Sequence, residues 1–133
     1  MPVALEIVSP EKLLLSRSVE MVVIPAAEGD MGVLAGHTPM IVTLRGGTID
    51  LYEGDRVTDR LYVAGGFAEV TPTRCTVLAN EAVPVGEIDR GAADKRLADA
   101  EAAYATESKN GTAAEDVALD RVQAARAMVA AAA

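Results

Sequence analysis

Short apolar segments separated by turn-forming residues fill the first two-thirds of the chain. Val3, Leu5 and Ile7 alternate with residues that face the other way, which is the period of a half-buried β-strand. Pairs of glycine, proline or small polar residues interrupt these segments, and Gly54-Asp55 has the composition of a tight hairpin turn. The pattern predicts eight strands, at 3–9, 19–25, 40–44, 48–52, 57–63, 67–71, 75–79 and 82–85.

Strands this short and this numerous do not form one flat sheet with a dry face, whereas two packed sheets bury one face of each. We therefore predict an all-β sandwich domain at residues 1–86. The glycine-rich stretch at 28–39 is expected to be a loop with two sharp turns that exposes Glu28 and Asp30 at its tip.

The remainder of the chain, residues 87–133, changes to helical composition. Residues 92–133 contain 17 alanines, whereas residues 1–91 contain 8. Asn110-Gly111 is expected to end a first helix, and Thr112 with Glu115 has the spacing of a capping box at the start of a second. Apolar residues at helical spacing form one stripe on each helix, at Ala93, Leu97, Ala100 and Tyr104 and at Ala118, Val122, Ala125 and Val129. The pattern predicts an antiparallel two-helix hairpin that packs thinly, because alanine buries little apolar area.

The charge and aromatic content exclude several classes of protein. Twelve Lys and Arg against twenty Asp and Glu give a net charge of −8, which argues against binding to nucleic acid or to an anionic membrane surface. Aromatic residues make up 3% of the chain, so stacking platforms for bases or sugars are not expected. The longest apolar runs, 21–27 and 127–133, have seven residues each, and a membrane-spanning helix needs about 20, so we expect no direct membrane insertion.

Candidate catalytic or metal-binding groups are few. His37 is the sole histidine and has no His or Cys cluster beside it in sequence, so no metal site and no catalytic site is predicted. Cys75 lies in an alternating strand pattern and is expected to be a small buried hydrophobe. The stretch at 28–39 lacks the Lys-Ser/Thr ending of a phosphate loop, so phosphate binding is not expected there. Its two carboxylates suit a basic protein partner, and a merely solvated turn explains this loop equally well when it is considered alone.

Five segments carry a family resemblance. In order along the chain they are Val8-Ser9-Pro10-Glu11, the stretch at 28–40, Leu44-Arg45-Gly46-Gly47, the stretch at 65–70 and the stretch at 77–82. Together they resemble the epsilon subunit of the F-type, proton-translocating ATP synthase, and the likeness runs from about residue 3 to residue 133. The run Gly-Val-Leu-x-Gly-His-x-Pro at 32–39 is specific for that family.

The resemblance implies a ten-stranded β-sandwich followed by a helical hairpin, and a non-catalytic role in the central stalk. A subunit of this family binds gamma and the ring of c subunits and turns with them during rotary coupling of proton flow to ATP synthesis. Residues of the c-ring and gamma interface carried over by the resemblance are Glu28, Asp30, Met31, His37 and Thr38. An acidic tip would form charge-assisted contacts with the basic loops of the ring.

In the same family the hairpin can extend along gamma toward the alpha and beta subunits and brake ATP hydrolysis. The second helix here offers only Arg121 and Arg126 as cations, so the sequence predicts weak inhibition at most. Some members bind ATP through an Ile/Leu-Asp-x-x-Arg-Ala motif, and this chain has Ala92 where the motif has arginine. No resident cofactor is therefore expected. The candidate nucleotide ligands by resemblance are Asp89, Arg90, Arg121 and Arg126.

Two other functions stay open at this stage. A stand-alone β-sandwich that binds a ligand would need an aromatic or concave surface, and a small hydrolase would rest on His37. The resemblance, with no transit peptide in the sequence, predicts a peripheral location on the cytoplasmic face of a bacterial inner membrane.

Overall fold

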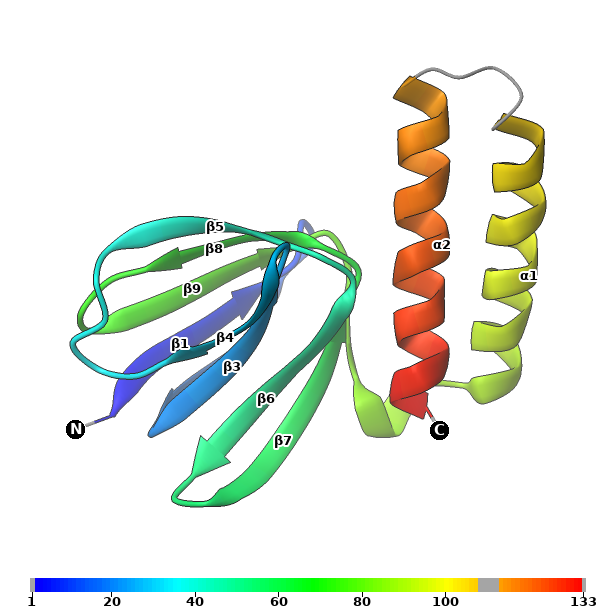
Figure 1. Cartoon of the computed structure of the whole chain (residues 1–133). Helices are drawn as coiled ribbons and strands as arrows, with labels where there is room; N and C mark the ends of the chain where they lie inside the picture. The colour runs from blue at the N-terminus through cyan, green and yellow to red at the C-terminus, as the bar shows by residue number, and fades with distance from the viewer. Residues whose placement is uncertain (1, 108–112, 133) are drawn as a thin grey trace.

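The computed structural model describes residues 2–107 and 113–132, and over these it forms a folded β-sheet followed by two helices (Figure 1). The strands are β1 (Val3–Val8), β2 (Leu13–Val19), β3 (Met21–Ala26), β4 (Gly29–Val33), β5 (Met40–Leu44), β6 (Gly47–Glu53), β7 (Arg56–Val63), β8 (Gly66–Val70), β9 (Arg74–Ala79) and β10 (Ala82–Pro84). A 3-10 turn, η1 (Val85–Glu87), leads to α1 (Arg90–Glu107) and α2 (Ala113–Ala132).

Hydrogen bonds join all ten strands into one continuous sheet that folds over itself. The order is β10-β7-β6-β3-β5-β8-β9-β1-β2, and β4 pairs with β3 outside this path. Of the strand pairs, β1 and β9 are parallel and the others are antiparallel. Arg17 of β2, at one end of the sheet, forms an ion pair with Asp59 of β7, the strand next to the other end. The predicted sandwich is confirmed, as a near-barrel.

Alternating apolar residues form the core between the two layers. Val3, Leu5 and Ile7 of β1 have no exposed surface, and Leu5 and Ile7 lie beside Cys75 and Val77 of β9. Burying each large aliphatic side chain contributes roughly 1.5–3 kcal/mol. Cys75 is buried, as the strand pattern predicted, and burial raises the pKa of its thiol to about 11.

Two strands were missing from the sequence prediction. β2 begins with consecutive leucines and continues as Ser-Arg-Ser, so it has no clear alternation. β4 lies inside the stretch that was expected to be a loop, because two glycines and Asp30 have low strand propensity. It forms as the second arm of a hairpin, paired with β3 from Val22 opposite Val33 to Ala26 opposite Gly29. Pairing with an apolar partner strand overrides the local propensity.

The two helices lie side by side, and α2 is the inner helix against the sandwich (Figure 1). Of the predicted stripes, Ala93 of α1 and Ala118, Val122 and Ala125 of α2 are buried. The other four members are partly exposed: Leu97, Ala100, Tyr104 and Val129. Met128 is also buried and belongs to no predicted stripe. The expected helix break at 110–111 and the capping box of Thr112 and Glu115 lie outside the described residues and side chains.

Candidate partner-binding sites

A row of apolar side chains crosses the outer face of four adjacent strands, and three of its four members are exposed. Phe67 of β8 is paired with Leu78 of β9, Leu78 is paired with Val8 of β1, and Val8 is paired with Leu13 of β2. Phe67, Leu78 and Leu13 are each more than half exposed, at 54%, 51% and 55%. We call Leu13, Val8, Leu78 and Phe67 the apolar row. It was not among the sequence predictions, although apolar residues on the outward side of strands are an available signal.

The β3–β4 hairpin carries the acidic tip. Ala27 and Glu28 form its two-residue turn, and Gly29 follows at a φ of 148°, a conformation that favours glycine. Glu28 is exposed and has no ion pair or hydrogen bond with any residue that the structure describes. Asp30 is also exposed, but Arg45 donates a hydrogen bond to its carboxylate at 2.5 Å. The charge that the tip leaves free for a partner is therefore mainly that of Glu28.

A hollow of about 470 Å³ lies between this tip and β5. Its lining includes Glu28, Asp30 and Met31 from the hairpin and Met40 and Ile41 from β5. Met31 is half-buried and packs against the main core. The structure thus brings three of the five predicted interface residues together around one hollow.

His37 and Thr38 lie in the next loop, before β5, and do not line this hollow. The His37 Nδ1 atom is 2.8 Å from the carbonyl oxygen of Thr38, its neighbour in sequence. The Gly36 N–H donates a hydrogen bond to the Pro72 carbonyl at 2.6 Å, which ties this loop to the β8–β9 turn. Among the described side chains, no group of three or more His, Cys, Asp or Glu could hold a metal ion.

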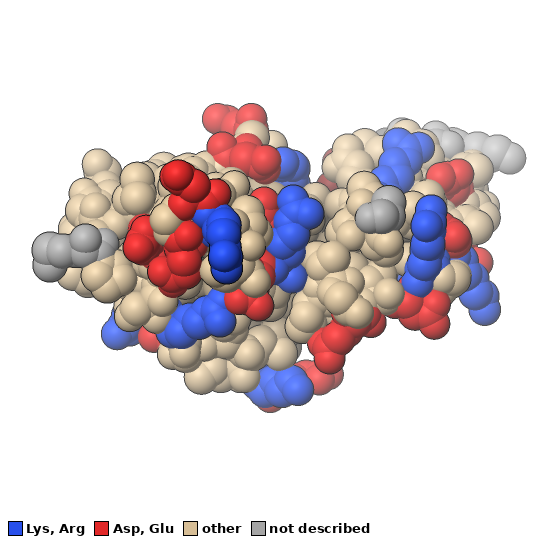
Figure 2. Space-filling view, turned by 90° about the horizontal axis from the view of Figure 1, so that it is seen from below, with Lys and Arg blue, Asp and Glu red and all other residues tan. Residues whose placement is uncertain are grey.

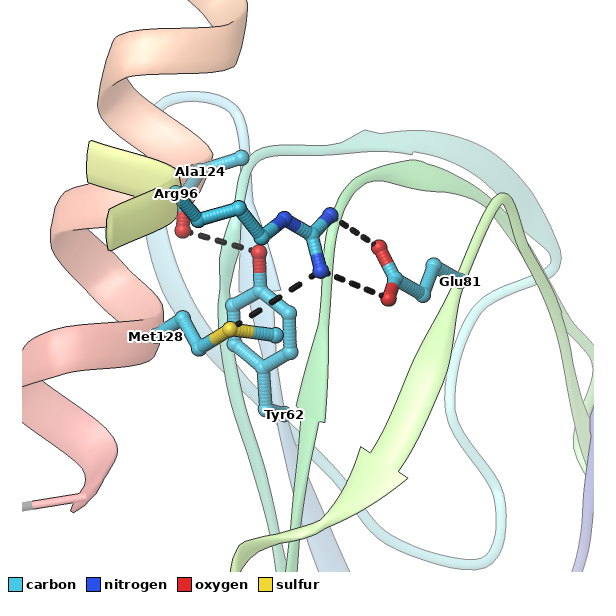
Figure 3. Close-up of polar contacts among 5 residues, drawn as sticks. All are labelled: Tyr62, Glu81, Arg96, Ala124 and Met128. Atoms are coloured by element: carbon cyan, nitrogen blue, oxygen red, sulfur yellow. Dashed lines mark hydrogen bonds and ion pairs between the residues drawn. The ribbon is translucent and has the colours of Figure 1, made fainter. Parts of the chain in front are cut away.

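A polar cluster joins the helical hairpin to the sandwich (Figure 3). The buried Tyr62 hydroxyl of β7 donates a hydrogen bond to the Ala124 carbonyl of α2 at 2.8 Å. Arg96 of α1 makes a two-armed ion pair with Glu81, and its Nη1 lies 3.9 Å from the Met128 sulfur. Burial raises the pKa of Tyr62 to about 12, and the hydrogen bond from Arg96 lowers the pKa of Glu81. We call Tyr62, Glu81, Arg96, Ala124 and Met128 the interdomain cluster.

Gly46 allows the closest backbone approach between the two domains. A Cβ atom at this position would lie 2.6 Å from the Ala124 Cα of α2, which is far inside van der Waals contact. Glycine pairs were predicted to interrupt the strands, and Gly46-Gly47 is one of them. The sequence did not show that the backbone of α2 packs directly against Gly46. Gly46 on the sheet and Ala124 on the helix are both small, so the two backbones can approach closely.

The four candidate nucleotide ligands do not lie together in one site. The Asp89 carboxylate accepts hydrogen bonds from the Gly91 and Ala92 N–H groups at 2.9 and 3.2 Å and so caps α1. It lines a hollow of about 180 Å³, whereas Arg121 lines a different hollow of about 400 Å³ between the helices and the sandwich. Arg90 and Arg126 are exposed and line neither hollow.

The surface charges also fit a protein partner better than a nucleic acid. On the face shown in Figure 2, acidic side chains separate the basic ones, so the part of the chain described there presents no continuous basic stripe. An exposed apolar row, an acidic tip and a docked helical hairpin define a β-sandwich docking subunit with a helical appendage.

Comparison with known proteins identifies the family to which this β-sandwich docking subunit belongs. Residues 2–85 match the family "ATP synthase, Delta/Epsilon chain, beta-sandwich domain". The chain is 70% identical to the ATP synthase epsilon chain of Granulibacter bethesdensis over 97% of this chain and 96% of the relative. It is 46% identical to that of Gluconacetobacter diazotrophicus, over 99% and 94%. The chain belongs to the ATP synthase epsilon-chain family.

A solved structure agrees with this assignment. A chain in the cryo-EM structure of the Euglena gracilis mitochondrial ATP synthase, containing OSCP, F1 and the c-ring, aligns with a TM-score of 0.78 and 28% identity. The alignment covers 98% of this chain and 81% of that chain. The sequence-based recognition of the family, and the prediction of a non-catalytic subunit, are confirmed.

Proposed function

We propose that the chain is a central-stalk rotor subunit that links gamma to the c-ring and transmits rotation between proton flow and ATP synthesis. The apolar row carries this proposal. Three of its four side chains are large, apolar and more than half exposed, and a contiguous apolar patch of this kind marks a protein interface. The family resemblance implies gamma and the c-ring as partners, and a solved relative lies in an F1 and c-ring assembly. We assign the row to gamma, because a charged tip suits the polar loops of the ring better than an apolar row does.

The acidic tip is assigned to the polar loops of the c-ring. Glu28 offers a carboxylate with no partner among the described residues, and Asp30 and Met31 lie beside it on the same hollow. Asp30 would share its charge between Arg45 and a basic side chain of the ring. His37 and Thr38 would contact the neighbouring surface near gamma.

Paired serine substitutions in the apolar row test the gamma assignment. Phe67→Ser with Leu78→Ser removes two exposed side chains, so the fold should stay intact while affinity for purified gamma falls at least about tenfold. Val57→Ser is the matched control, because Val57 is also exposed but lies on β7 outside the row. Unchanged gamma binding by the folded double variant would contradict the proposal.

The helical hairpin is proposed as a weak regulatory element. It is docked on the sandwich here, and extension toward the alpha and beta subunits would require the interdomain cluster to open. Helix α2 has two basic residues, Arg121 and Arg126. With so few cations, we expect the extended hairpin to bind acidic surfaces weakly and to inhibit ATP hydrolysis weakly. Nucleotide binding is not part of the proposal, since Ala92 replaces the motif arginine and the candidate ligands line different hollows.

The same assignment gives a location. No helix in the described part of the chain is long and apolar enough to cross a membrane. We place the chain at the periphery of the membrane complex, on the cytoplasmic face of a bacterial inner membrane. Its 70% identity to the epsilon chain of Granulibacter bethesdensis supports the bacterial assignment.

A further inference from the structure

Strand β5 is fully paired on one side and almost unpaired on the other. It pairs with β8 from Met40 to Leu44, whereas on the opposite side the ladder with β3 contains one residue pair, Ala26 and Leu44. The Thr43 carbonyl accepts a hydrogen bond from the Ala27 N–H at 2.8 Å beside that pair. Beyond it, the β3 chain turns back into β4 and leaves the rest of β5 without a neighbouring strand.

The direction of the free backbone groups follows from strand geometry. Backbone N–H and C=O groups of successive residues point to opposite sides of a strand. The Thr43 carbonyl points toward the side of β3, so the N–H and C=O of Ile41, two residues away, point to the same side. No described strand pairs with Ile41 there. The amide of Val42 points the other way, into the ladder with β8.

The residues of this edge favour strand addition. Met40 to Thr43 read Met-Ile-Val-Thr, which has strong strand propensity and no charge. Ile41 is 75% exposed, the highest value among the exposed large apolar side chains of the described chain. Soluble proteins usually protect a free edge with charge, proline or shortness, because an unprotected edge pairs with another chain.

Other free edges in the sheet are protected in these ways. β10 has three residues and ends in Pro84. β2 is bridged to β7 by the ion pair of Arg17 with Asp59. β4 carries Asp30 between its glycines. The edge of β5 stands apart from them, which indicates that a partner covers it in the assembled state.

The space beside the edge has room for such a partner. The hollow of about 470 Å³ runs from β5 to the β3–β4 turn, where the carboxylate of Glu28 has no described partner. An extended segment along β5 would fill the β5 side of the hollow and leave this carboxylate to the c-ring. The edge is also continuous with the apolar row, since Thr43 of β5 is paired with Phe67.

We propose that β5 accepts an extended segment of the stalk partner as an added strand, by β-augmentation. The inference rests on the proposed function and specifies how gamma is held. The Ile41 N–H donates to a carbonyl of the segment, and the Ile41 carbonyl accepts from one of its N–H groups. The segment has an apolar side chain against Ile41, and the Glu28 carboxylate at the far end of the hollow remains available to the c-ring.

Amide hydrogen exchange in the free chain and in its complex with purified gamma tests this directly. In the free chain the Ile41 amide should exchange quickly and the Val42 amide slowly, since Val42 is already bonded to β8. In the complex, exchange at Ile41 should slow at least about tenfold, while Val42 serves as the internal control. A complex that forms and leaves Ile41 at its free rate overturns the proposal.

Two further outcomes are distinct from that one. Failure of the wild-type chain to bind gamma contradicts the proposed function itself. Protection of Ile41 in the free chain, together with a dimeric mass in solution, assigns the edge to a second copy of the chain and overturns the proposal.

Substitutions at Ile41 separate the backbone contribution from the side-chain contribution. Ile41→Pro removes the N–H on the open side and leaves the ladder with β8, whereas Ile41→Thr keeps the N–H and shortens the apolar side chain. Both lie at an exposed edge, so both variants should fold, and melting temperatures check this. Ile41→Pro should weaken gamma binding about tenfold more than Ile41→Thr. Equal affinities overturn the proposal, and the exchange experiment on the unmodified chain decides if the proline variant does not fold.

Discussion

At the scale of single residues, the side chains that join the two domains are few. Tyr62 is fully buried on the sandwich side and uses its hydroxyl to reach a backbone carbonyl of α2. The Arg96–Glu81 ion pair lies at a partly exposed position, where such pairs contribute under about 1 kcal/mol. Tyr62 and the close contact between Gly46 and α2 should therefore contribute more than the ion pair to docking of the hairpin on the sandwich.

Docking should weaken in alkaline solution because of Tyr62. Its pKa is about 12 in the docked structure against an ordinary value of 10.0, so the neutral phenol is favoured by docking. The stabilisation is fully present below the ordinary pKa and is lost as the pH rises from there through the raised value. Thermal unfolding across this range should show the loss in the wild-type protein. The buried Cys75 thiol, whose pKa is also raised, titrates in an overlapping range, so Tyr62→Phe should reduce the pH dependence without abolishing it. An identical pH dependence in both proteins would rule out Tyr62 as a cause.

The close contact between Gly46 and the backbone of α2 leads to a steric prediction. Gly46→Ala would place a Cβ 2.6 Å from the Ala124 Cα, so α2 must shift and docking should weaken by roughly 1–3 kcal/mol. Limited proteolysis of the hairpin should accelerate accordingly. Gly86→Ala is the matched control, because a Cβ there meets nothing within 4 Å. Equal cleavage rates in the two variants would show that Gly46 is not under steric constraint.

At the scale of elements, some strands are specified by their own sequence pattern and others by the strand with which they pair. β1 was predicted because Val3, Leu5 and Ile7 alternate. The hairpin at Gly54-Asp55 was predicted because glycine supplies the positive φ of a tight turn, and Gly54 has a φ of 62°. β4 was not, since its sequence has the composition of a loop and its pairing with β3 is what makes it a strand. Elements whose own residues fix the conformation can be recognised locally, and elements stabilised by a partner cannot.

The start of α1 provides a prediction at this scale. Asp89→Ala removes the acceptor for the Gly91 and Ala92 N–H groups, so the first turn of α1 should lose about 1 kcal/mol of stability. Faster amide exchange at these two residues is the measurement. Asp99→Ala, which removes an exposed carboxylate from the same helix, is the control and should leave them unchanged. If both variants exchange alike, Asp89 does not act as the cap.

At the scale of the whole molecule, the sandwich and the hairpin have separate apolar cores. The main cluster contains sandwich residues alone, whereas Ala93 and Met128 form a second small cluster with Tyr62. The inner helix α2 makes most of the contact with the strands (Figure 1). This division supports the boundary at residues 86 and 87 as a proposal about folding units, with a sandwich that does not depend on the helices.

Truncation tests that proposal and the weak regulatory role together. A chain of residues 1–86 should unfold cooperatively on its own, because its main core is complete. ATP synthase assembled with this fragment should hydrolyse ATP at less than about tenfold the rate of the intact complex. Circular dichroism melting and steady-state hydrolysis are the measurements. A non-cooperative fragment would contradict the domain boundary, and a many-fold rise in hydrolysis would contradict weak inhibition.

The sequence by itself determined the fold class and the family. Alternation in strands such as β1, the change to alanine-rich helices and the run at 32–39 are local features, and local features can be identified without coordinates. The tertiary structure decided which surface residues act together. The apolar row exists because strand register places Leu13, Val8, Leu78 and Phe67 side by side, and the edge of β5 is free because β3 turns back beside it. Those arrangements depend on pairing between distant segments, which no local pattern specifies.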